Sequence, residues 1–127
     1  MHPAELVEAL QRATTDARNP IIRFARDGDV HAVSDGLLAL LGFSREEFEA
    51  GAIDWDELTP PQYWALDEYC LGQLLKSGVA EPYVKELVRK DGTRIAVRIL
   101  CAINAGSPSE GVALVVELTE RESPLAS

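Results

Sequence analysis

Two Asp-Gly turns, at Asp27-Gly28 and Asp91-Gly92, constrain the fold of this chain more than any other feature. Each turn lies between two short segments rich in apolar residues, and Asp-Gly readily adopts the positive φ angles of a tight hairpin. Strands joined by a tight hairpin must be antiparallel neighbours. The sequence therefore predicts one hairpin at residues 21–33 and a second that begins at residue 83.

The strand that follows the second turn is predicted to have one buried face. Every second residue from Ile95 to Ile103 is apolar, whereas the alternate phase begins with Arg94. A period of two is typical of a strand that lies against a core on one side. Residues 112–118 show the same alternation and predict the last strand. Residues 83–89 mix polar and apolar side chains on both phases, so their inward face is ambiguous.

The segment between the two hairpins carries helix signals. Ser34 can cap a short helix that Gly42 ends, because Ser accepts backbone hydrogen bonds and Gly tolerates the left-handed conformation. Ser44 and Glu47 form a capping box for the next helix. Residues 54–58 predict one further helical turn.

Two longer helices are also predicted. Residues 60–77 form the longer one, with Thr59 as its cap, Gln62 completing a capping box and Gly78 as its left-handed end. Residues 3–18 form an amphipathic helix with a narrow apolar stripe. Because the other helices cluster in one insertion between the hairpins, they should cover one face of one sheet, which predicts an α+β fold.

Charge and size exclude several classes of function. The 127 residues contain 12 Lys and Arg against 21 Asp and Glu, a formal net charge of −9. That balance argues against nucleic-acid partners and against an anionic membrane surface. No apolar run has the length of a membrane span and the N-terminus is unlike a signal peptide, so a cytoplasmic location is expected. Residues 44–68 are acidic and residues 85–98 mostly basic, which favours two solvated faces over a docking surface.

Catalysis and metal binding have little support. Cys70 and Cys101 lie among apolar residues and are expected to be buried, reduced thiols. Neither has a His or another Cys at metal-ligand spacing, and the acids at Asp54, Asp56 and Glu57 lack the glycine and spacing of a calcium loop. No phosphate loop, dinucleotide fingerprint or nucleophile elbow is present. We therefore expect a protein that is not an enzyme and binds no metal.

Four short motifs follow one another within residues 21–121. They are Asp27-Gly28 with Val33-Ser34-Asp35 and Leu40-Leu41-Gly42-Phe43-Ser44; Leu58-Thr59-Pro60-Pro61; residues 82–94, which end in Arg89-Lys90-Asp91-Gly92-Thr93-Arg94; and Glu117-Leu118-Thr119-Glu120-Arg121. Each motif is weak alone, but together and in this order they resemble the PAS domain family. The chain departs from the family at Ser34, where Asn is frequent, and at Glu117, where Asp is frequent.

The resemblance implies a five-stranded antiparallel sheet with several helices packed on one face. Residues 20–121 would form the PAS domain, after a capping or dimerisation helix at residues 1–19 and before a flexible tail at residues 122–127. PAS domains commonly dimerise through a helix that precedes the first strand, so a homodimer is expected. The candidate dimer contacts are Leu6, Leu10, Ala13 and Ala17.

Members of the family often hold a small ligand between sheet and helices. The candidate lining residues here are Leu37, Leu41, Tyr63, Leu66, Cys70, Val97, Ile99 and Cys101. Either these side chains only pack against each other, as apolar stripes usually do, or they enclose a small apolar or aromatic ligand. If Leu66 is core, replacing it with Ala should cost about 2–5 kcal/mol of stability.

The sequence leaves any cofactor unidentified and argues against two familiar ones. Haem-binding PAS domains usually place a His on or near the long helix, whereas the histidines of this chain are His2 and His31, and His31 lies in a short predicted strand. The light-sensing flavin subfamily needs a Cys inside Asn-Cys-Arg-Phe, whereas Cys70 stands in Tyr-Cys-Leu.

The function implied by the resemblance is a regulatory sensor or interaction module of bacterial-type signal transduction. It would bind a small ligand or a protein effector and relay that event by a conformational shift. One alternative is a ligand-free homodimerisation domain, such as the sensory part of a larger kinase or cyclase. Another is a small enzyme that uses the cavity, for which Asp67 and Tyr63 are the plausible ionisable groups.

Overall fold

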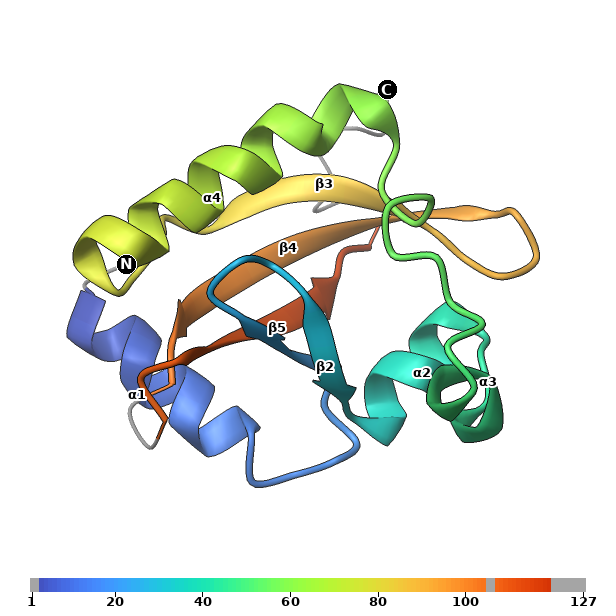
Figure 1. Cartoon of the computed structure of the whole chain (residues 1–127), viewed down its shortest axis with the longest axis horizontal. Helices are drawn as coiled ribbons and strands as arrows, with labels where there is room; N and C mark the ends of the chain where they lie inside the picture. The colour runs from blue at the N-terminus through green and yellow to red at the C-terminus, as the bar shows by residue number, and fades with distance from the viewer. Residues whose placement is uncertain (1–2, 105–106, 120–127) are drawn as a thin grey trace.

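The computed structural model describes residues 3–104 and 107–119, and Figure 1 shows its elements. Their order is α1 (Pro3–Ala13), β1 (Ile21–Ala25), β2 (Val30–Val33), α2 (Asp35–Leu41), α3 (Arg45–Glu49), the 3₁₀ turn η1 (Pro61–Tyr63), α4 (Trp64–Ser77), β3 (Tyr83–Val88), β4 (Arg94–Ile103) and β5 (Glu110–Glu117).

The five strands form one antiparallel sheet in the order β2-β1-β5-β4-β3. The two predicted hairpins lie at its two edges, and their turns contain Gly28 at φ 95° and Gly92 at φ 90°. The last strand, β5, pairs with β1 on one side and with β4 on the other, so it joins the two hairpins into one sheet. The predicted α+β fold with a five-stranded antiparallel sheet is confirmed.

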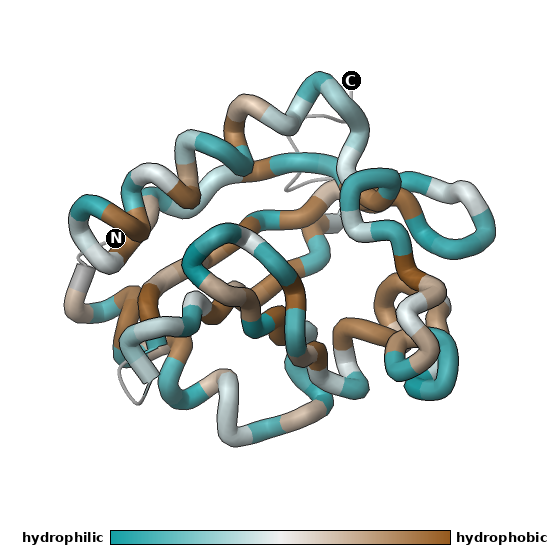
Figure 2. The backbone as a smooth tube through the Cα atoms, viewed as in Figure 1, coloured by the Kyte–Doolittle hydropathy of each residue, from teal (hydrophilic) through white to brown (hydrophobic). Residues whose placement is uncertain are grey.

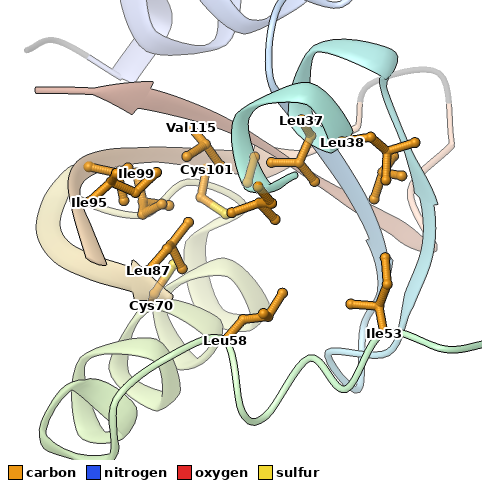
Figure 3. Close-up of a cluster of buried hydrophobic side chains, with 14 of the residues drawn as sticks. Leu37, Leu38, Ile53, Leu58, Cys70, Leu87, Ile95, Ile99, Cys101 and Val115 are labelled. Atoms are coloured by element: carbon orange, nitrogen blue, oxygen red, sulfur yellow. The ribbon is translucent and has the colours of Figure 1, made fainter. Parts of the chain in front are cut away.

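The core lies between the sheet and the helices of the central insertion. Buried side chains from α2, α4 and the sheet point toward one another there, as Figure 3 shows for Leu37, Cys70 and Val115. Figure 2 shows that hydrophobic residues are frequent in the interior strands and in α2, whereas the hairpin turns are hydrophilic. We call this side of the sheet the inner face.

The helix α1 lies on the opposite side of the sheet, the outer face. Leu6 and Leu10 of α1 pack there against Leu100 and Ala102 of β4. Because successive residues of a strand point to opposite faces, these two β4 residues face away from the inner core. The prediction of a single buried face for β4 is therefore wrong for its second half, since α1 covers the other phase.

The predicted caps of the short helices are present. Ser34 Oγ accepts a hydrogen bond from Leu37 N at 3.2 Å, and Gly42 ends α2 in the left-handed conformation at φ 86°. Both bonds of the capping box between Ser44 and Glu47 are formed at the start of α3. Local side-chain chemistry therefore defines these helix ends.

The helix α1 is shorter than predicted, because it ends at Ala13 and not at residue 18. The hydroxyls of Thr14 and Thr15 donate to the carbonyls of Gln11 and Arg12 at 2.9 and 2.7 Å. The Asn19 amide also donates to Ala13 O at 3.0 Å. Such side chains offer the last carbonyls an alternative to the next helical turn.

The start of α4 also differs from the prediction. Pro60 is extended, at φ −54° and ψ 141°, as expected of a residue that precedes another proline. A 3₁₀ turn follows, and α4 begins at Trp64 without a side-chain cap. Thr59 does not cap the helix, and its hydroxyl instead accepts a hydrogen bond from Lys85 Nζ. Residues 55–58 form hydrogen-bonded turns and no helix.

Candidate functional site

A cavity of about 390 Å³ lies between α4, the inner face of the sheet and the β1–β2 hairpin. Its walls come from β1, β3, β4 and β5, from Leu41 of α2, from the loop at residues 55–59 and from one side of α4. Most of the lining side chains are apolar, and the volume is within the usual range of small-molecule sites.

The structure places the eight predicted lining residues in three different settings. Four line the cavity, namely Leu41, Cys70, Ile99 and Cys101. Leu37 and Val97 are fully buried in the adjoining core but do not line the cavity, and buried Tyr63 donates its hydroxyl to Glu86 at 3.1 Å. The eighth, Leu66, is 39% exposed, so the prediction that it is core is wrong.

The reason for the error at Leu66 is that a polar residue takes the inward position. Along α4, residues 67, 70, 71 and 74 line the cavity, with the spacing of three and four that marks one helix face. The inward residue one turn before Cys70 is therefore Asp67 and not Leu66. A pattern that assigns apolar residues to the core cannot anticipate a carboxylate in that place.

Asp67 belongs to a polar cluster at one end of the cavity, which we call the Lys85 cluster and which comprises Thr59, Asp67, Tyr83 and Lys85. Lys85 Nζ donates to both carboxylate oxygens of Asp67 and to Thr59 Oγ1, each at 2.9 Å. The Tyr83 hydroxyl donates to Asp67 Oδ1 at 2.6 Å. The cluster therefore connects α4 to β3 and to the loop before η1.

Lys85 is the functional candidate that sequence reasoning missed. It is 8% exposed, although a lysine is almost never buried without a partner. One signal was available, because Lys85 shares its strand phase with Tyr83 and Leu87, and all three residues line the cavity. Among the described residues, no buried side-chain nitrogen or oxygen lacks a hydrogen-bond partner, so the cluster is internally satisfied.

The cluster keeps Tyr83 in its neutral form. Burial, and then the hydrogen bond to the Asp67 carboxylate, raises the pKa of the Tyr83 hydroxyl above its ordinary value. A neutral hydroxyl can donate, which suits the short bond to Asp67. Tyr83 and Lys85 therefore act together as hydrogen-bond donors to one carboxylate.

Exposed acidic residues mark the mouth of the cavity. Asp27, Asp56 and Glu68 are all exposed and line it from the β1–β2 turn, the central loop and α4. Lys85 is the single Lys or Arg among the lining residues, and Asp67 already neutralises it. The mouth is therefore negatively charged, whereas the cluster inside is an ion pair.

The two cysteines, Cys70 on α4 and Cys101 on β4, are buried free thiols, as predicted. A hydrogen bond between the two thiols, together with burial, raises the pKa of Cys101 well above its ordinary value. Thiolate is the reactive form of cysteine, so this environment opposes nucleophilic chemistry at Cys101.

The remaining sequence candidates lie elsewhere. Exposed His31 lies 2.6 Å from a carboxylate oxygen of Glu110 and does not line the cavity. Within residues 3–104 and 107–119, no group of three or more His, Cys, Asp or Glu residues has the geometry of a metal site. None of the helices in those ranges is long and apolar enough to cross a membrane.

The predicted dimer stripe packs largely within its own chain. Leu6 and Leu10 are buried against the sheet, Ala13 is half-buried and Ala17 is exposed. A dimer through the two leucines would require α1 to leave this sheet. The stripe therefore has a capping role here, and the homodimer stays a prediction.

The two departures from the PAS motifs both have partners. Ser34 Oγ accepts from Ile21 N at 2.8 Å and donates to Asn19 O at 2.5 Å, so it still bonds the neighbouring segment. Glu117 pairs with Arg89 at 3.0 Å.

The acidic segment at residues 44–68 and the mostly basic segment at residues 85–98 contact each other, since Lys90 Nζ lies 2.8 Å from a carboxylate oxygen of Glu47.

A five-stranded antiparallel sheet with helices across one face and a cavity between them defines a class of small α+β domain. Comparison with known proteins shows which fold of this class the chain has. No family model matches the chain. The hybrid signal transduction protein dokA of Dictyostelium discoideum is 31% identical over 101 residues, which is 79% of this chain but 6% of that protein. The chain thus spans a small part of that relative.

Solved structures show the same fold at low sequence identity. A domain of a sensory box sensor histidine kinase/response regulator from Geobacter sulfurreducens matches with a TM-score of 0.63 and 18% identity, covering 86% of this chain and 92% of that one. A PAS domain from Colwellia psychrerythraea matches with a TM-score of 0.65 and 17% identity, covering 87% and 97%. A LOV protein of Rhodobacter sphaeroides matches with a TM-score of 0.65 and 13% identity, covering 92% and 69%. The chain has the PAS fold, which confirms the resemblance seen in its motifs.

Proposed function

We propose that this domain is a regulatory sensory module that binds a small ligand in the cavity between α4 and the sheet. The observation that carries the proposal is the Lys85 cluster within a cavity whose other buried lining residues are apolar. Small-molecule sites combine apolar walls with a few placed polar groups in this way. The similarity to proteins of signal transduction supports a regulatory role, and we assign no catalytic step to the cavity.

The proposed relay depends on the position of the cluster between elements. Lys85 and Tyr83 belong to β3, whereas Asp67 belongs to α4. A ligand that alters these bonds changes the relative stability of two packings of α4 on the sheet, and its differential affinity sets the size of the shift. We place the module in cytoplasmic signalling of the bacterial type.

Native mass spectrometry of the purified chain, followed by denaturation and small-molecule analysis, tests this function. We expect a stoichiometric compound bound to the wild-type protein. Ala113 is buried and lines the cavity, so Ala113→Leu should reduce the bound fraction by filling the space. Ala80→Leu is the matched control, because Ala80 is equally buried but does not line the cavity. An empty wild-type protein that also binds nothing from a metabolite library would contradict the proposal.

A second candidate is a ligand-free interaction domain. The observation that favours it is the internal satisfaction of the Lys85 cluster, which needs no ligand to complete its hydrogen bonds. This candidate predicts an empty protein and a homodimer in light scattering. Removing residues 1–19 should then give a monomer in light scattering. A truncated protein that is still a dimer would exclude a dimer through α1.

A further inference from the structure

The Asp67 carboxylate is held in the cavity as a bound ligand would be. Its hydrogen-bond donors, Tyr83 and Lys85, come from β3, and Thr59 orients Lys85 from the loop before η1. The carboxylate itself comes from α4. The helix α4 thus presents an acidic group to hydrogen-bond donors that β3 provides.

We propose that Lys85, Tyr83 and Thr59 form a carboxylate-binding subsite, and that a small apolar carboxylate ligand takes the place of Asp67 there. This inference rests on the proposed ligand-binding function and names the chemical class of the ligand. Charge-assisted bonds to a carboxylate are among the strongest hydrogen bonds in proteins, which gives the subsite its selectivity.

The difference in burial between the two charged partners makes the exchange feasible. The Lys85 side chain is 10% exposed and the Asp67 side chain 34%. Asp67 can therefore turn toward water when it is released, whereas Lys85 stays inside and needs another anion. A neutral or cationic ligand in the place of Asp67 would leave a buried charge unpaired, which is strongly unfavourable.

The cavity also defines the rest of the ligand. Apolar side chains, among them Phe24, Leu71, Ile99 and Val115, line the space beside the cluster. A volume of about 390 Å³ exceeds the roughly 150 Å³ of an engineered cavity that holds benzene. An aromatic ring or short alkyl chain that bears one carboxylate fits this description.

Asp67 would then act as an internal competitor of the ligand. Its carboxylate occupies the subsite for part of the time. The apparent association constant for an external carboxylate is therefore the intrinsic constant multiplied by the fraction of time that the subsite is free. Release of Asp67 also removes the hydrogen bonds that connect α4 to β3. The same event that admits the ligand therefore loosens α4, which provides the signal.

The test is calorimetric titration of the full chain with 3-phenylpropionate and with its neutral isostere 3-phenylpropanamide. Asp67→Ala should bind 3-phenylpropionate about tenfold or more tightly than the wild type does, because the competitor is gone. Asp67→Asn, which keeps the size of the side chain, should change affinity in the same direction. Neither variant should gain affinity for the amide.

Two controls isolate the subsite. Glu81→Ala removes an exposed acid that does not line the cavity, so it should change affinity less than about threefold, as expected for an exposed charge. The double variant Asp67→Ala/Lys85→Met replaces the ion pair by apolar groups, a change that proteins often tolerate. It should fold and should lose the carboxylate preference.

Equal or weaker binding of 3-phenylpropionate by both Asp67 variants would overturn the inference, as would an amide that binds as tightly as the acid. Failure of the proposed function is a separate result. If the wild type retains a neutral or cationic compound in the cavity, the function stands and the carboxylate subsite is wrong. If the wild type is empty and no compound binds any variant, both are wrong.

Discussion

The two faces of the sheet are built differently. The inner face combines a large apolar core with a cavity and the ion pair of Lys85 and Asp67, whereas the outer face carries a small cluster of leucine and alanine side chains beneath α1. Both faces use β4, whose alternating residues point to one side and then to the other. The contrast teaches that burial alone does not mark a functional site, because the outer cluster is equally buried but the hollow beside it is about 30 Å³, far smaller than the inner cavity.

The largest expected effect comes from the dense part of the inner core. Leu37 is fully buried under α2, and Leu37→Ala should lower the free energy of unfolding by about 2–5 kcal/mol, because it leaves a cavity in close-packed surroundings. Urea unfolding measures the loss. A change near zero would mean that the inner core near α2 can collapse around the gap. The inner core would then not be more densely packed than the outer cluster.

The outer face should respond less strongly and more locally. Leu10→Ala removes a fully buried side chain from a cluster of four buried residues, and should cost about 2 kcal/mol, the low end for such changes. Because the buried side chains of α1 pack against the outer face, detachment of α1 need not unfold the domain. Hydrogen exchange should show faster exchange of α1 amides while β4 stays protected. Equal acceleration in both elements would show that the faces unfold together.

Much of the fold was predictable from local chemistry, because hairpin turns, caps and strand alternation depend on residues close in sequence. The Asp-Gly turns and the cap at Ser34 are examples, and the structure confirms them. The end of α1 was missed, since Thr14 and Thr15 compete for the last carbonyls of the helix.

The polar part of the site was not predictable in the same way. Lys85 pairs with a residue 18 positions away, and nothing in its own strand identifies that partner. Hydrophobic periodicity also assigned Leu66 to the core, because the pattern gives no weight to an inward-facing carboxylate. Asp67 entered the sequence analysis only as a plausible ionisable group. Polar residues of the candidate site broke the apolar pattern, and the pattern was therefore least reliable where this site lies.

The smallest expected effect separates the two sides of α4. Leu66 is on the exposed side, so Leu66→Ala should change the free energy of unfolding by about 0.5 kcal/mol or less, as is usual for surface positions. Leu74→Ala is the matched control on the same helix, and should cost about 2–5 kcal/mol because its side chain is buried. Urea melts of the two variants give the comparison directly. Equal losses would mean that Leu66 packs against the domain after all, and that α4 buries a wider face than the residues that line the cavity.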